Sequence, residues 1–429
     1  MKRTISVILI ICMLLVLASC DSGEELKEDL AQEIPPVQPT HEPQPIPLPP
    51  RESESEQVEP QESEDVFSGK IAIVTHSVDM DLETFMKAEA IVSGFGADRV
   101  IHRTWPIYFL QEPGLVVEIL TEIVSDPEVD AIVISQAYTS TNAAVEAVRA
   151  LRGDDIFIAV IFATVWENPH VVYERINLSL SVNTSGMGAW FVEQASKMGV
   201  ETIAHYSFPR HMQVPRIAEN RDNMAAAAEL AGIRFVDLPS PDPMDEGGNP
   251  AASQLFIFED IGGRFEQLGV NTAFFSTNCR QQFPLLQQVL TYGAMYVQPC
   301  CPSPFHAFPV AFRLVFDEAE ALLNFTVGEI IEATREVIVA AGMEGRISNW
   351  AISARTAYTH VGFMYAIEWL NGRVSQEFGV IDEDVLLRLF GDYAEEALGE
   401  RLYPQMSQMQ ADSETFSTRF EFLMPFIVY

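Results

Sequence analysis

The sequence is poor in positive charge. Its 429 residues include 26 Lys or Arg against 61 Asp or Glu, which gives a formal net charge of −35. Binding to nucleic acid depends on basic side chains that neutralise phosphates, and adhesion to anionic lipid headgroups has the same requirement. The charge balance therefore excludes nucleic acid as a partner and argues against a lipid surface held by charge.

The familiar catalytic and cofactor motifs are also missing. The chain has no G-x-x-x-x-G-K-[ST] phosphate loop, no G-x-S-x-G elbow and no H-E-x-x-H zinc helix. The fragment Gly94-Phe-Gly96 precedes a predicted strand, the reverse of the dinucleotide fingerprint. Eight scattered histidines show no spacing suited to zinc. These absences predict a protein that is not an enzyme and that carries no cofactor or metal.

The first twenty residues predict export. Lys2 and Arg3 form a basic head, followed by an apolar run over 5–17. A run of about 13 residues is shorter than the roughly 20 that a membrane-spanning helix needs, so a signal segment is favoured. The ending Leu17-Ala18-Ser19-Cys20 resembles the lipobox of bacterial lipoproteins, which implies lipidation of Cys20 as the mature N-terminus. The alternative is an ordinary secretory signal with an incidental cysteine.

Residues 21–66 lack aromatic side chains and have the composition of a tether. They hold 14 acidic residues, two basic residues and nine prolines, with a net charge of −12. Such a segment cannot bury enough apolar area to offset its ordering entropy, and we expect it to be disordered. Its reach is about 35–40 Å as a random coil and roughly 140 Å as an extended polyproline helix.

Three cysteines remain in the mature body: Cys279, Cys300 and Cys301. An exported location permits a disulfide, yet three cysteines leave one thiol over. The adjacent pair could form a vicinal bridge, Cys279 could pair with either member, or all three could be free thiols. Because the chain has no C-x-x-C motif, the sequence gives little support for a metal-binding or redox role of these cysteines.

The body, residues 67–429, carries 47 acidic and 22 basic residues and alternates short apolar runs with amphipathic segments. Continuous apolar strands that alternate with helices predict parallel sheets covered on both faces. At 363 residues the body suits two lobes better than one core. We predict an α/β protein of two doubly wound Rossmann-like lobes around a cleft, at 67–182 and 183–305, with a mainly helical C-terminal region at 306–429 that packs on the lobes.

The second half carries the resemblance to a known family. Arg221–Ile233 looks like a family helix that ends at a Gly before the next strand, and Asn271–Asn278 looks like its strand that ends in a polar pair. This layout resembles the type I periplasmic-binding-protein fold over roughly 68–325. The stretch Tyr206–His211, with the lipobox and the overall size, also resembles a group of bacterial lipoproteins of unknown function. The resemblance implies two lobes that close on a ligand held at the carboxyl ends of their strands.

Polar side chains at the predicted strand ends form the candidate ligand site, because parallel strand ends expose helix N-termini and backbone donors. They are Thr75, His76, Ser77, Ser135, Gln136, Tyr138, Thr164 and Trp166 in the first lobe, and Tyr206, Arg210, His211, Thr277, Asn278 and Gln298 in the second. Amides, hydroxyls and aromatic rings suit a neutral polar ligand such as a sugar or nucleoside. Each residue has an ordinary alternative as a helix cap or loop side chain. For Arg210 and His211 we favour pairing with a neighbouring carboxylate across the cleft over contact with an anionic ligand.

These features predict a lipid-anchored extracytoplasmic solute-binding protein that delivers a small molecule to an ABC-type membrane permease. An alternative is a ligand sensor or protein-interaction lipoprotein without a transport role, which the helical C-terminal region could serve. An enzyme on this scaffold ranks third. A cytoplasmic transcription factor is excluded, because the chain is exported, acidic and lacks an N-terminal helix-turn-helix.

Overall fold

The computed structural model describes residues 67–106, 112–137, 140–161, 175–244, 249–314, 326–411 and 414–429. The predicted signal peptide, Cys20 and the tether lie outside these residues, as do three predicted site residues, Tyr138, Thr164 and Trp166.

The first lobe is built on a seven-stranded sheet in the order β10-β11-β5-β4-β3-β1-β2. The strands are β1 (Lys70–Thr75), β2 (Val100–Thr104), β3 (Val129–Ile134), β4 (Phe157–Ile161), β5 (Leu178–Val182), β10 (Gln405–Ala411) and β11 (Glu414–Leu423). All neighbours run parallel except the antiparallel pair β10 and β11. The apolar runs found in the sequence therefore form a parallel sheet, as predicted.

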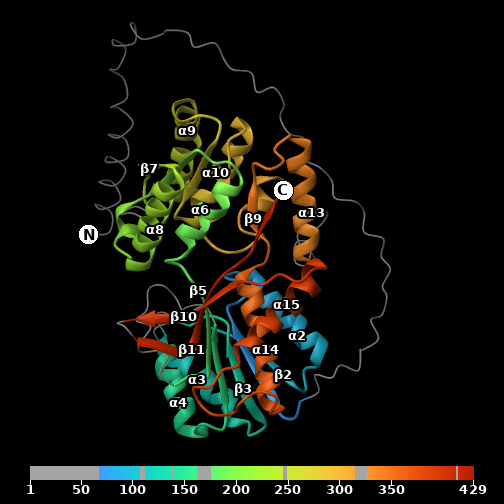
Figure 1. Ribbon diagram of the computed structural model, residues 1–429. Coiled ribbons are helices and arrows are strands. Elements are labelled where there is room, and N and C mark those ends of the chain that lie inside the picture. Colours follow the sequence, from blue (N-terminus) through green and yellow to red (C-terminus); the bar gives the residue numbers. More distant parts are fainter. Residues whose placement is uncertain are drawn as a thin grey trace, which may run out of the picture. The chain divides into compact units, whose positions relative to one another are not determined.

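Helices cover both faces of this sheet (Figure 1). They are α2 (Leu82–Phe95), α3 (Pro113–Ser125), α4 (Thr141–Arg152), α14 (Ala354–Leu370) and α15 (Glu383–Leu398). Successive side chains of a strand point to opposite faces. Ile71 and Ile73 of β1 therefore pack with α2, α14 and α15, whereas Ala72 and Val74 pack with α3 and α4. This alternation makes two buried layers around one sheet.

The second lobe repeats the plan on a smaller sheet in the order β7-β6-β8. Its elements are α6 (Met187–Lys197), β6 (Thr202–Ser207), α7 (Pro209–Met212), α8 (Pro215–Ala231), β7 (Arg234–Pro239), α9 (Pro250–Leu268), β8 (Thr272–Ser276), α10 (Cys279–Tyr292), α11 (Phe308–Ala311), α13 (Val327–Ala340), β9 (Ser348–Trp350) and β12 (Phe426–Val428). Parallel bridges from Ala273 to Met295 and from Tyr296 to Ile347 extend the order toward β9. Both lobes thus have the doubly wound order expected of this fold class, which confirms the prediction.

The chain passes between the lobes three times. It crosses after β5 into α6, returns between β9 and α14, and crosses again between β11 and β12, which pairs antiparallel with β9. The region 306–429 is therefore divided between the lobes: α13 and β9 belong to the second, and α14, α15, β10 and β11 to the first. Among the described residues 306–314, the short helix α11 is formed.

Side-chain contacts join helices of the second lobe to β11, β12 and the residues that connect them. The Trp190 indole of α6 donates to the carbonyl of Met424 at 2.9 Å and stacks on Phe426. Arg216 of α8 forms an ion pair with Glu421 of β11. These contacts join segments more than 200 residues apart in the sequence, so the periodicity of either segment alone could not predict them.

One glycine allows close packing of helices in the second lobe. A Cβ on Gly188 of α6 would lie 2.0 Å from the carbonyl oxygen of Asn220 and 2.8 Å from the amide nitrogen of Met224, both in α8. Real Cβ atoms do not approach backbone so closely, and the opposing atoms belong to a helix that cannot yield locally. Gly188 is therefore fixed by packing between α6 and α8.

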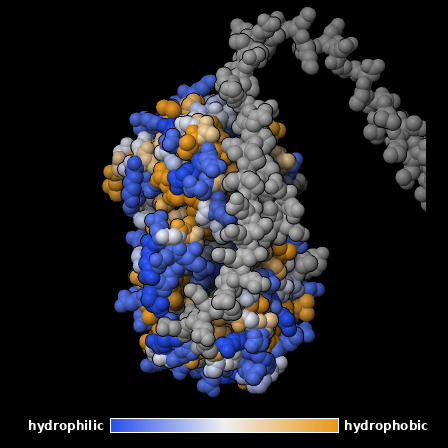
Figure 2. All heavy atoms as spheres, turned by 90° about the vertical axis from the view of Figure 1, so that its right-hand side faces the viewer, coloured by the Kyte–Doolittle hydropathy of each residue, from blue (hydrophilic) through white to orange (hydrophobic). Residues whose placement is uncertain are grey.

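The surface view in Figure 2 shows where polar side chains gather. Figure 2 shows hydrophilic side chains over much of one face, with smaller apolar groups among them. No helix in the described ranges combines the length and the apolar content needed to cross a membrane.

Candidate functional site

The first-lobe strand ends hold mostly internal hydrogen bonds. The Thr75 hydroxyl donates to the His76 carbonyl at 2.7 Å and lies 2.8 Å from Nε2 of His102. The Ser77 carbonyl accepts from the turn that starts α2. Burial lowers the pKa of His76 to about 4, so its ring is neutral at pH 7. Three predicted site residues (Thr75, His76 and Ser77) therefore lie at one strand end, and they shape the entry to α2.

Ser135 and Gln136 follow β3 and contact α14. The Thr359 hydroxyl donates to the Ser135 hydroxyl at 3.1 Å, and Arg355 Nη1 donates to Gln136 Oε1 at 3.4 Å. The β3 strand end is thus joined to a helix more than 200 residues later in the chain. Arg355 was not among the predicted site residues, because the sequence pattern of this helix does not indicate to which lobe it belongs.

Acidic and hydroxyl side chains next to Arg355 form a cluster that we call the polar junction: Asp81, Glu83, Ser303, Ser353 and Arg355. Arg355 pairs with Asp81, whose carboxylate also caps α2 by accepting from the Thr84 amide at 3.3 Å. The Ser303 hydroxyl donates to Glu83 at 2.9 and 3.0 Å, and Ser353 donates to the same carboxylate. Burial raises the pKa of Glu83.

The polar junction links the two lobes directly. Glu83 lies in the first turn of α2 in the first lobe, whereas Ser303 follows the second-lobe segment that leaves the sheet at Gln298. Strand ends of the two lobes therefore come within hydrogen-bond distance. Because the Arg355 charge is already balanced by Asp81, the junction favours a neutral polar ligand over a free anion.

In the second lobe, Arg210 makes a two-point ion pair with Asp242 at 2.7 and 2.8 Å. Arg210 thus pairs with a carboxylate, but Asp242 lies in its own lobe and not across the cleft as the sequence favoured. His211 lies 3.0 Å from the Thr277 hydroxyl, and burial, reinforced by Arg210, lowers the pKa of His211 to about 4. His211 and Thr277 are thus brought together, but within one lobe.

Two predicted second-lobe residues have structural roles. Asn278 caps α10 by accepting from the Arg280 amide at 2.9 Å. Tyr206 is fully buried, and its hydroxyl donates to Asp260 of α9 at 2.9 Å. The alternation along β6 places Tyr206 on the face covered by α9 and α10, where its hydroxyl is already bonded, and its contact with a ligand stays a prediction.

Gln298 is the predicted residue with the most unusual environment. It ends the strand-like segment that begins at Met295, and it is 1% exposed. Neither the amide nitrogen nor the amide oxygen of its side chain has a hydrogen-bond partner among the described residues. A buried unpaired polar group costs about 1–3 kcal/mol, so such groups persist where a ligand or water completes them.

The three cysteines lie together beside this segment. Sγ of Cys279 is 3.5 Å from that of Cys300 and 3.4 Å from that of Cys301, and the adjacent pair is 3.9 Å apart. Nε2 of His306 lies 4.0 Å from Cys300 Sγ. Hydrogen bonding within the cluster lowers the pKa of Cys279 and raises the pKa values of Cys300 and Cys301. No C-x-x-C spacing marks the cluster, because it joins α10 to the end of the next strand.

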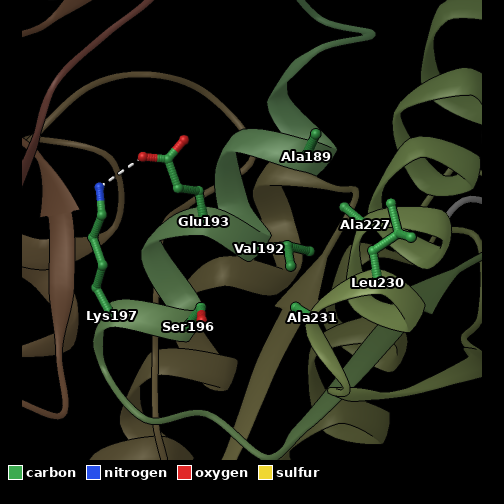
Figure 3. A pocket seen from close by; sticks show the side chains of 8 residues that line it. All are labelled: Ala189, Val192, Glu193, Ser196, Lys197, Ala227, Leu230 and Ala231. Atoms are coloured by element: carbon green, nitrogen blue, oxygen red, sulfur yellow. Dashed lines mark hydrogen bonds and ion pairs between the residues drawn. The ribbon is translucent and has the colours of Figure 1, made fainter.

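A separate open groove of about 510 Å³ lies on the outside of the second lobe (Figure 3). Helices α6 and α8 line it with mostly small or apolar side chains: Ala189, Val192, Glu193, Ser196, Lys197, Ala227, Leu230 and Ala231. Glu193 and Lys197 form an ion pair at its edge, and Leu230 is 91% exposed. The groove contains none of the strand-end residues and lacks the convergent polar groups of a small-molecule site.

Comparison with known protein families identifies the family of this chain. The model of a family described as proteins of unknown function (DUF3798) matches residues 69–348. The chain belongs to the DUF3798 family. An uncharacterised protein of Treponema pallidum (strain Nichols) is 29% identical to this DUF3798 protein over 230 residues, covering 52% of this chain and 98% of that one. A second from the same organism is 30% identical over 144 residues, covering 34% and 64%.

A solved structure supports the fold. A protein from Clostridium difficile 630, described as a candidate transcriptional regulator, superposes with a TM-score of 0.74 at 18% identity. The match covers 85% of the DUF3798 protein and all of that chain. At this identity the likeness shows the fold alone. Together with the strand order of both lobes, it confirms the predicted type I periplasmic-binding-protein-like fold and the family of unknown function.

Proposed function

We propose that this DUF3798 protein is a lipid-anchored extracytoplasmic solute-binding protein, not an enzyme, that captures a small polar ligand at the facing strand ends of its lobes. The observation that carries the proposal is the buried amide of Gln298, which has no hydrogen-bond partner within the part of the chain that the structure describes. An amide offers one donor group and one acceptor, which suits a hydroxyl of a sugar or nucleoside.

The polar junction supports the same ligand class. The hydrogen bond from Ser303 to Glu83 is a contact between lobes, and such contacts form and break when lobes close and open about crossing segments. Ligand binding would favour the closed arrangement to the extent that the ligand binds it more tightly than the open one. In the proposed cycle, an ABC-type permease accepts the ligand from the closed form.

The test is a thermal-shift screen of the protein against sugars, nucleosides, amino acids and vitamins. A ligand at 100 times its Kd should add about 2.7 kcal/mol to the free energy of unfolding, which raises Tm. The same ligand should not raise the Tm of Gln298→Met, while Leu230→Ser in the outer groove serves as a control that keeps the full shift. No shift with any compound class would contradict capture of a small polar ligand.

Export and anchoring are tested separately through Cys20. The lipobox-like Leu17–Cys20 predicts that the protein fractionates with membranes and incorporates labelled fatty acid. A Cys20→Ala variant should lose the label and leave the membrane fraction. Equal label in both chains would contradict lipidation at this cysteine.

The second candidate is a ligand-sensing or protein-interaction lipoprotein without a transport role. The outer groove favours it, because Leu230 is an exposed apolar side chain within a mostly apolar strip. A crosslinked partner that depends on Leu230, with transport of the ligand unchanged when Leu230 is replaced, would favour this function over delivery to a permease.

A further inference from the structure

We propose that Cys279, Cys300 and Cys301 form a thiolate site for one thiophilic metal ion, with Zn²⁺ the best match. The three sulfur atoms lie 3.4, 3.5 and 3.9 Å apart. A tetrahedral ion with metal–sulfur bonds of about 2.3 Å holds its sulfur ligands about 3.8 Å from one another. The observed triangle therefore needs shifts of only a few tenths of an ångström to receive the ion.

The backbone that carries the cysteines is fixed by contacts outside the cluster. The Trp350 indole donates to the Pro299 carbonyl at 3.2 Å, and the amide of Ala354 donates to the Pro302 carbonyl at 2.9 Å. Cys279 opens α10, whose first turn is capped by Asn278. Ligands held on rigid elements lose little freedom when they bind a metal, which is how pre-organised sites gain affinity.

The fourth position of a tetrahedral ion is left to solvent. His306 Nε2 lies 4.0 Å from Cys300 Sγ, but it is not within 4.8 Å of all three sulfur atoms, so the three cysteines form the ligand set by themselves. Cys279 is exposed, and the other two cysteines are half-buried. Cys279 is therefore the member of the cluster nearest to solvent.

The ligand set determines which ions fit. Three thiolates select soft or borderline ions such as Zn²⁺ and Cu⁺ over Mg²⁺ and Ca²⁺, which prefer oxygen. On binding, each thiol releases its proton to solvent as a metal–sulfur bond forms, so no oxidant or reductant is required. This site does not depend on the proposed capture of a polar ligand, since metal binding can be measured without that ligand or any permease.

The experiment titrates the reduced full-length protein with Co²⁺, a spectroscopic substitute for Zn²⁺, and then displaces it with Zn²⁺. We expect one Co²⁺ per chain, thiolate-to-cobalt charge-transfer absorption in the near ultraviolet, and loss of that absorption as Zn²⁺ enters. Each of Cys279→Ser, Cys300→Ser and Cys301→Ser should weaken Co²⁺ binding by at least about 100-fold, since losing even an outer-shell partner costs roughly 10–100-fold. Arg280→Gln, beside Cys279 but without a sulfur ligand, should bind as the parent does.

Two results would overturn the proposal. One is Co²⁺ binding of equal affinity in the parent and the three cysteine variants, with circular dichroism showing that all are folded. The other is protein isolated without reductant that carries a disulfide from Cys279 to Cys300 or Cys301, and that after reduction shows no charge-transfer band with Co²⁺. A normal ligand-induced Tm shift alongside either result would leave the proposed solute binding intact.

Discussion

Replacing Gln298 with methionine should make the protein more stable while it abolishes ligand binding. The side chain is 1% exposed and neither of its polar atoms has a partner among the described residues. Methionine has a similar length and no group that demands a hydrogen bond. Removing the desolvation penalty of an unpaired buried group should raise the free energy of unfolding by about 1–3 kcal/mol.

A second buried glutamine provides a matched control with the opposite sign. Gln282 in α10 is also fully buried, but its amide donates to the Ser276 carbonyl at 2.7 Å and its oxygen accepts from the Tyr296 hydroxyl at 2.7 Å. Gln282→Met leaves both partners unpaired, so it should lower the free energy of unfolding by about 1–3 kcal/mol. The same chemical change therefore has opposite consequences at two buried sites.

Urea unfolding followed by circular dichroism measures both variants against the parent. The reasoning requires a higher midpoint for Gln298→Met and a lower midpoint for Gln282→Met, with equal slopes. A Gln298→Met chain that loses stability as Gln282→Met does would refute it, because the amide would then be satisfied within the protein. The site would lose its principal ligand-binding group.

Three further predictions concern stability. Asp81→Asn removes the carboxylate that pairs with Arg355 and should lower the free energy of unfolding by about 3 kcal/mol in urea titrations. Little change would show that the pair is solvated. The pKa of His211 is about 4 in the folded chain against 6.5 unfolded, so the unfolded state binds more protons between these values. The contribution of His211 to stability should therefore rise by up to about 3 kcal/mol from pH 4 to 6.5. His211→Asn should reduce the slope in this window, while the similar contribution of His76 remains. Gly188→Ala should lower Tm by several degrees, because the added methyl group would overlap with α8. Gly263→Ala in α9 has open space around the new methyl group and should raise the free energy of unfolding by up to about 1 kcal/mol. Equal effects of the two substitutions would contradict the packing argument.

Local sequence patterns predicted the lobes well, because the apolar pattern of each strand reflects how its two faces are buried. Runs such as Ile71–Val74 are buried on both faces of a parallel sheet, so they stay apolar at every position. The C-terminal region was harder to assign. Helix α14 is almost entirely buried, so its sequence shows little alternation of apolar and polar faces. Strand β11 joins the first-lobe sheet 232 residues after β5 ends, so no local pattern indicates this pairing.

The candidate site was predictable only where a strand and its polar end are adjacent in the sequence. Gln136, His211, Thr277 and Gln298 were proposed in that way, and their contact with a ligand stays a prediction. The polar junction was not found, because Glu83, Ser303 and Arg355 meet through three distant parts of the chain. The cysteine cluster was not predicted for the same reason: Cys279 is distant in the sequence from the other two cysteines, although all three were identified individually.

The measurement that tests the central claim most directly is the identification of what the protein carries from its own cell. The full chain would be isolated from the envelope fraction under mild conditions and then denatured, and the released small molecules would be identified by mass spectrometry. Gln298→Met would be processed in parallel. The account predicts one class of small polar molecule, near one per chain, released from the parent and absent from the variant. Equal amounts of any such molecule from both chains, or none from either, would contradict ligand capture at Gln298.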